Sequence, residues 1–192
     1  MAVGLVLASL LGRRKRAPVP SLIQRAPAGD PPTAVAVAPI PAPSIVALNH
    51  GAVLEAIRRP GEILVVNHWA TWCEPCVEEL PYLGRLAQEL AGRVRFVGIS
   101  WDRFSDDDGA DAVRSRVDEA RRLAGAAFES WIAPPDSAGF LAAAQLADAR
   151  IPQTAVLTRR GAVAWNHLGE ITSDGDRRAL EGAIAAALSE PL

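Results

Sequence analysis

The chain contains few of the residue types on which disulfide frameworks and metal sites depend. Its 192 residues include two cysteines, three histidines and one methionine, and the formal net charge is −2 at pH 7. Two cysteines cannot build the disulfide network that stabilises small secreted domains, and a structural zinc ion needs about four ligands. A charge so close to zero predicts neither a nucleic-acid-binding protein nor a polyanion. The two cysteines therefore have a chemical role or none.

The first 43 residues differ in composition from the rest. The apolar run at residues 2–11 is too short to span a bilayer, which needs about 20 residues. A basic cluster at residues 13–16 follows this run, whereas a secretory signal carries its positive charges in front. Residues 17–43 are rich in proline and alanine. We expect residues 1–43 to form a short apolar segment, a basic cluster and a disordered linker, and residues 44–192 to form the folded domain.

Two interpretations of this N-terminal segment remain open. It is either part of a signal or anchor that tethers the domain in the cell envelope or periplasm, with a proline-rich spacer, or a disordered tail of a cytoplasmic protein. The positive-inside rule, applied literally, favours the cytoplasm.

The rest of the chain alternates between β-rich apolar stretches and amphipathic stretches. Strands are expected at residues 62–70, 94–100, 127–132, 153–158 and 162–168, and helices at residues 74–92, 110–123, 137–146 and 174–188. The first strand, helix and strand predict a parallel pair joined by a crossover, and the last two strands predict an antiparallel hairpin. The fold class is therefore α/β, with a mixed central sheet and flanking helices in a thioredoxin-like arrangement.

The two cysteines, Cys73 and Cys76, lie where the first strand ends and a helix begins. Unpaired N–H groups and the helix dipole at this position stabilise a thiolate, so we expect Cys73 to be the nucleophile. Cys76, one turn later, is placed to resolve the mixed disulfide that Cys73 forms. Pro75 suits the first helical turn, where its missing N–H has no cost. Trp72 provides an apolar platform for a substrate.

Pro81 stands inside the expected helix. It should kink the helix by removing a hydrogen bond to the carbonyl of Val77. Alternatively, the helix begins at Pro81 itself, since proline favours the first position.

The stretch at residues 64–82, with its Cys-Glu-Pro-Cys motif, resembles the active-site region of the TlpA/ResA-like thiol-disulfide oxidoreductases. These are bacterial proteins of the thioredoxin superfamily, usually tethered outside the cytoplasm. The resemblance extends over residues 44–192. It implies a cis peptide bond between Ile151 and Pro152, facing the dithiol, with backbone groups nearby that pair with an extended substrate. It also places Asn67 where thioredoxin has a buried, proton-relaying aspartate.

Glu79 is our candidate for the missing acid. Residues three apart share a helix face, so Glu79 should lie one turn below Cys76, where partial burial would raise the carboxyl pKa and suit it to exchange protons with the thiols. Glu78 points elsewhere. The alternative is that both are solvated glutamates near a helix start.

Three further groups bear on the direction of the reaction, the thiols and metal binding. The Glu74 carboxylate beside Cys73 opposes thiolate formation, which favours a reducing couple. His68 is either a core histidine or a group that perturbs the thiols. The acidic residues 106–108 have no bidentate acid at calcium-loop spacing, so no metal site is expected there.

These features predict a protein-disulfide reductase that needs no cofactor or metal and exchanges thiols with cysteine-containing proteins and with a dithiol electron donor. The resemblance implies a role in cytochrome c maturation or envelope redox homeostasis. Two alternatives are a copper chaperone that uses both thiols and His167, and a peroxide-reducing redoxin. The second lacks the Pro-x-x-x-Thr-x-x-Cys segment.

Overall fold

The computed structural model describes residues 44–46, 50–57, 59–102, 109–133 and 150–191. The expected N-terminal linker, the acidic residues 106–108 and the helix expected at residues 137–146 lie outside these ranges. Within them, no helix is long and apolar enough to cross a membrane.

One mixed sheet organises the described residues. Its strands are β1 (Ile45–Val46), β2 (Leu64–Trp69), β3 (Arg95–Ser100), β4 (Glu129–Ile132), β5 (Gln153–Leu157) and β6 (Val163–Leu168), in the spatial order β1-β4-β3-β2-β5-β6. Pairing is parallel from β1 to β2 and antiparallel between β2, β5 and β6. The expected crossover, hairpin and α/β fold class are confirmed.

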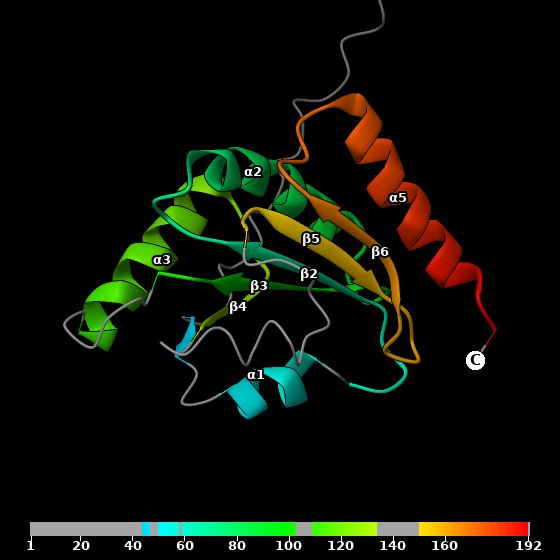
Figure 1. Ribbon diagram of the computed structural model, residues 1–192, viewed down its shortest axis with the longest axis horizontal. Coiled ribbons are helices and arrows are strands. Elements are labelled where there is room, and N and C mark those ends of the chain that lie inside the picture. Colours follow the sequence, from blue (N-terminus) through cyan, green and yellow to red (C-terminus); the bar gives the residue numbers. More distant parts are fainter. Residues whose placement is uncertain (1–43, 47–49, 58, 103–108, 134–149, 192) are drawn as a thin grey trace, which may run out of the picture. The chain divides into compact units, whose positions relative to one another are not determined.

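The helices are α1 (His50–Ile57), α2 (Glu74–Glu89), α3 (Ala110–Ala124) and α5 (Asp174–Ser189). Helices α2 and α3 cover one face of the sheet, α1 lies on the other, and α5 packs along β5 and β6 (Figure 1). All six residues of β2 are buried, including the polar Asn67 and His68, as expected for a central strand covered on both faces. The sequence did not predict β1 or α1. A two-residue strand carries no readable pattern, and α1 is a short helix of eight residues.

Helix α2 runs from Glu74 to Glu89 with Pro81 in its interior, so the alternative of a helix beginning at Pro81 is wrong. Pro75 occupies the first turn, and the Val77 N–H donates to the Cys73 carbonyl at 3.1 Å, which closes that turn. The helix ends before Gly92, whose φ of 77° turns the chain toward β3. The dithiol is therefore attached directly to a long helix whose inner face is part of the core.

The C-terminal helix begins as expected. The Ser173 side chain accepts a hydrogen bond from the Asp176 N–H at 3.1 Å, and Asp174 and Asp176 lie in the first turn, where the dipole favours negative charge. The loop before this cap contains Ile171, which is fully buried. Its backbone takes part in the site described next.

Candidate active site

The central strand β2 delivers the two cysteines to the start of α2. Its last residue, Trp69, and the following Ala70 are fully buried, and the Cys73 N–H donates to the Ala70 carbonyl at 3.2 Å. This turn places Cys73 at the N-cap of α2. Cys73 and Cys76 are joined by a disulfide, with their Cα atoms 5.2 Å apart.

The two sulfur-bearing residues differ in accessibility. Cys73 is 8% exposed, whereas Cys76 is completely buried. A partner can therefore reach the disulfide through Cys73 and not through Cys76. At the N-cap of α2, the helix dipole favours a negative charge on the Cys73 sulfur.

The surface around Cys73 contains the expected substrate-binding residues. Trp72, which immediately precedes Cys73, is 58% exposed, and Ile151 is partly exposed. The Ile151–Pro152 peptide bond is cis. β5 begins at Gln153, which lies opposite His68 of β2. Pro152 therefore lies at the same end of these two strands as the dithiol turn. The Pro152 carbonyl accepts from the Gly169 N–H at 2.9 Å, so this group is not among those open to a substrate backbone.

Glu79 is buried in a hydrogen-bonded cluster beneath the dithiol. It is 1% exposed, whereas Glu78 next to it is exposed. One carboxylate oxygen, Oε1, accepts from Asn67 Nδ2 at 2.6 Å, and the other, Oε2, accepts from the Ile171 N–H at 2.8 Å. Asn67 Nδ2 also donates to the hydroxyl of Thr154 at 3.0 Å. Helix α2, strand β2 and the loop before α5 thus meet at one carboxyl group, and strand β5 contacts it only through Asn67.

Burial raises the pKa of the Glu79 carboxyl from 4.5 to about 7. The hydrogen bonds from Ile171 and Asn67 oppose this rise, and the negative charge of Glu170 adds to it. A group with a pKa of about 7 is present in both protonation states near neutral pH, which suits proton exchange. Residues three apart share a helix face, so this carboxyl lies on the same side of α2 as Cys76.

His68 is fully buried, and desolvation lowers its pKa to about 3. Its Nδ1 accepts a hydrogen bond from the indole N–H of Trp101 at 3.2 Å. The imidazole is therefore uncharged at neutral pH and supplies no positive charge to a thiolate. Of the two expectations for His68, the structure supports the core histidine.

A second buried carboxylate, Asp102, ties the dithiol turn to the end of β3, and this role was not predicted from the sequence. Asp102 is 4% exposed, and its carboxylate accepts from the N–H of Thr71 at 3.0 Å and from the Thr71 hydroxyl. It also accepts from the Ser100 hydroxyl at 2.5 Å. Thr71 lies two residues before Cys73, so its hydrogen bonds to Asp102 fix the backbone where the dithiol turn begins. The available signal was the Ser-x-Asp spacing at the end of a strand.

We expect Asp102→Ala to loosen this turn. The substitution removes the acceptor of the partly buried Thr71 N–H and of the buried Ser100 hydroxyl, which costs about 1–3 kcal/mol. Urea unfolding of the oxidised protein should show a free energy of unfolding lower by that amount. Asp111→Ala, which removes an exposed carboxylate on α3, is the matched control and should change it by less than about 0.5 kcal/mol. Equal stability of the two variants would contradict a holding role for Asp102.

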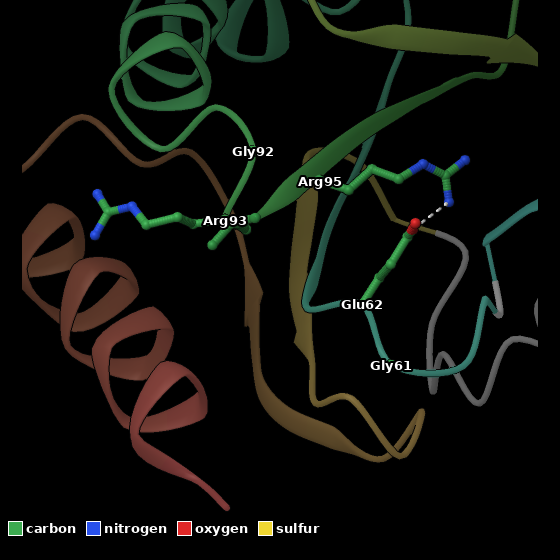
Figure 2. Close-up of a pocket in the computed structure, with 6 residues that line it drawn as sticks. Gly61, Glu62, Gly92, Arg93 and Arg95 are labelled. Atoms are coloured by element: carbon green, nitrogen blue, oxygen red, sulfur yellow. Dashed lines mark ion pairs between the residues drawn. The ribbon is translucent and has the colours of Figure 1, made fainter. Parts of the chain in front are cut away.

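A cavity of about 360 Å³ lies at the other end of the central strands (Figure 2). Its lining residues come from the segments that enter β2 and β3, about 17 Å from the C-terminal end of β2 at the usual rise per residue. Arg95 pairs there with Glu62 at 3.6 Å and with Glu129 at 2.7 Å, while Arg93 points away (Figure 2). This cavity is separate from the dithiol. Within the described residues, no three His, Cys, Asp or Glu side chains gather as metal ligands.

The fold and the dithiol are those of the thioredoxin superfamily, and sequence comparison agrees. Residues 37–184 match the redoxin family. The chain belongs to the redoxin family and is a TlpA-like member of that superfamily.

Several relatives support this placement. The chain is 25% identical over 176 residues to the thiol:disulfide interchange protein CycY of Rhizobium leguminosarum bv. viciae, covering 92% of this chain and 81% of the relative. It is 29% identical to the thiol:disulfide interchange protein DsbE of Yersinia pestis, covering 61% of this chain and 54% of that protein. Matches to the thioredoxin-like protein YneN of Bacillus subtilis and the M-type thioredoxin of Brassica napus span only 24% and 33% of those proteins.

Solved structures show the same fold. A thioredoxin-family thiol:disulfide interchange protein from Chlorobium tepidum has a TM-score of 0.53 at 23% identity, covering 79% of this chain and 97% of its own. A thioredoxin-related protein from Neisseria meningitidis has a TM-score of 0.53 at 21% identity, covering 69% and 88%.

Proposed function

We propose that this protein is a thiol-disulfide oxidoreductase that reduces disulfides in other proteins. The observation that carries the proposal is the Cys73–Cys76 pair at the N-terminus of α2, in which Cys73 is 8% exposed and Cys76 is completely buried. This asymmetry gives the two cysteines different roles. Cys73 meets the partner, and Cys76 acts within the protein.

The reaction transfers two electrons from the reduced dithiol to the partner. The Cys73 thiolate attacks one sulfur of the partner disulfide, which forms a mixed disulfide and releases the first partner thiolate. The Cys76 thiolate then attacks the Cys73 sulfur, which forms the Cys73–Cys76 disulfide and releases the second partner thiolate. A dithiol donor reduces the protein again by the reverse exchange.

Glu79 is the proposed acid/base group of this cycle. Cys76 must lose its proton to attack, and it lies in a buried place where water does not reach it directly. Glu79 is buried one helical turn away with a pKa near 7, so its carboxylate can accept that proton and return it when the disulfide is reduced. Trp72 and Ile151 form the proposed contact surface for the partner chain, beside Pro152.

The direction of the reaction follows from Glu74, which is exposed next to Cys73. Its negative charge disfavours the thiolate and therefore the reduced state, so the couple should be more reducing than about −120 mV, the potential of strong periplasmic oxidants. Equilibration with glutathione measures this potential. Glu74→Gln should raise it by about 10 mV, as expected for one exposed charge pair. A wild-type potential at or above about −120 mV would overturn the assignment as a reductase.

The proposal also covers the substrate class of the protein and its location in the cell. We infer that residues 1–43 tether the domain formed by residues 44–192 outside the cytoplasm, and that its partners are oxidised cysteines of envelope proteins, such as apocytochrome c. The resemblance to TlpA/ResA-like proteins supports this inference. Partner trapping, described in the Discussion, tests it.

A further inference from the structure

The buried amide of Asn67 serves Glu79 in a way that the sequence did not indicate. We propose that the Asn67 side chain has two orientations: its nitrogen faces Glu79 when the carboxyl group is charged, and its oxygen faces Glu79 when the carboxyl group carries a proton. The inference rests on the proposed function, because it concerns the group that exchanges protons with Cys76. It makes Asn67 a positioning residue.

The observed contacts suit only the charged form of Glu79. Both carboxylate oxygens accept from N–H groups, at 2.6 Å from Asn67 and 2.8 Å from Ile171. A carboxylic acid has an O–H that needs an acceptor. A proton on either oxygen would face a donor, and Glu79 is too buried for water to substitute. One of the two partners must therefore change when Glu79 is protonated.

Only Asn67 can make that change. The Ile171 donor is a backbone N–H in a buried loop, and its direction is set by the chain. The Asn67 amide, by contrast, exchanges its oxygen and nitrogen by half a turn about the Cβ–Cγ bond, with nearly the same shape in both orientations. The strand and the helix need not move.

The surroundings of the amide fit such a rotation. In the observed orientation, Nδ2 donates to Glu79 and to the Thr154 hydroxyl, while Oδ1 is buried and has no hydrogen-bond partner within the described residues. After rotation, Oδ1 would accept from the protonated Glu79 and from Thr154, because a hydroxyl group can donate as well as accept. Each orientation leaves one side of the amide unpaired, so neither is locked in place. The charge on Glu79 then selects between them.

Among the groups packed around Glu79, the carboxyl of Glu79 itself is the one that binds the proton. Strands β2 and β5 present the uncharged side chains of Asn67 and Thr154, the loop before α5 contributes Glu170, and α2 itself carries Cys73 and Cys76. Burial and the charge of Glu170 both favour the protonated carboxyl, while the two N–H donors favour the charged one. An aspartate at position 67 would add a like charge and divide the proton between two carboxyl groups. Asparagine leaves Glu79 as the single proton site, and its amide can rotate to match the charge on that carboxyl group.

Nuclear magnetic resonance of the full-length oxidised protein tests the proposal, because neither cysteine titrates in the disulfide. The side-chain NH₂ of Asn67 should show a strong nuclear Overhauser effect to the Thr154 methyl group well above pH 7, the approximate pKa of Glu79. Below it, the effect should weaken several-fold, with the same midpoint as the Glu79 side-chain carbon resonance. In Glu79→Gln the orientation should not depend on pH. An unchanged effect across the titration of Glu79 would overturn the proposal.

A second variant keeps the proposal separate from the proposed function. Asn67→Leu removes donor and acceptor with a similar volume, so the Glu79 resonance should titrate at higher pH, and the pH profile of disulfide reduction should shift upward with it. An unshifted Glu79 titration in this variant would show that Asn67 does not act on the carboxyl group. A wild-type protein that fails to reduce disulfides would overturn the proposed function alone, because the orientation is measured in the oxidised protein without turnover.

Discussion

Cys73→Ser is expected to reduce disulfide-exchange activity to the uncatalysed background. The substitution removes the one sulfur that a partner can reach, since Cys76 is completely buried. A serine hydroxyl at this position has no comparable nucleophilicity without an adjacent base. Reduction of insulin by the protein, with dithiothreitol as the electron donor, measures the loss.

Cys76→Ser should behave differently from Cys73→Ser. Cys73, the more accessible of the two, can still attack a partner disulfide, but no second thiol resolves the product, so a mixed disulfide accumulates. Non-reducing electrophoresis and mass spectrometry of adducts formed in cells would identify the partners. Envelope proteins among them would support the proposed location, and cytoplasmic partners alone would contradict it.

The double variant Cys73→Ser/Cys76→Ser is the control and should trap nothing. If Cys73→Ser captured partners while Cys76→Ser did not, the assigned roles would be reversed. That outcome would also contradict the difference in burial on which the assignment rests.

Glu79→Gln should make the protein more stable at pH 8 and change little at pH 4. Folding raises the pKa of this carboxyl from 4.5 to about 7, so the folded state binds the proton more tightly than the unfolded chain. The stabilising contribution of the protonated group is complete below about pH 4.5 and is lost as the pH rises through about 7. Above that pH, the buried charge costs on the order of 3 kcal/mol, which glutamine avoids.

Urea unfolding at a series of pH values measures this difference. The matched control is Glu78→Gln, because Glu78 is exposed and lies next to Glu79 on the same helix. It should leave the pH dependence of stability unchanged. A wild-type protein with no loss of stability between about pH 5 and 8 would show that the pKa of Glu79 is not raised.

The same variant tests the proton-exchange role. With Glu79→Gln, the rate of exchange should fall and its pH dependence should lose the step near pH 7, because no carboxylate accepts the Cys76 proton. Unchanged thiol titration and exchange rates would leave Glu79 as a buried structural group.

Much of the fold was predictable because the central elements have strong local patterns. The apolar run of β2, the amphipathic periodicity of α3 and the Ser173 cap of α5 appear in the sequence without reference to distant residues. The expected strand limits were one or two residues too wide, as at β4, which begins at Glu129, whereas the expected helix α3 ended one residue early. Strand β1 was missed because its two residues form a strand only by pairing with β4.

The site was predictable only in part, for the same reason. Glu79 could be proposed from its helical spacing to Cys76, which is a local property. Its partner Ile171 lies 92 positions away in the chain, and Thr154, which accepts from Asn67, lies 87 positions from Asn67. No local pattern predicts these hydrogen bonds, because a buried hydrogen bond between distant segments depends on the sheet register and on the paths of the loops.

By itself, the sequence determined the chemistry available to this protein: a single dithiol at the start of a helix, flanked by Glu74 and Pro75, in a thioredoxin-like α/β domain. These are properties of neighbouring residues, and local physical chemistry is enough to derive them. Only the tertiary structure decided which sulfur is reachable, that Glu79 is buried while Glu78 is not, and that Asn67 and Asp102 hold the two sides of the site. Burial and hydrogen-bond partners arise when distant segments pack together, and they set the electrostatics on which proton exchange depends.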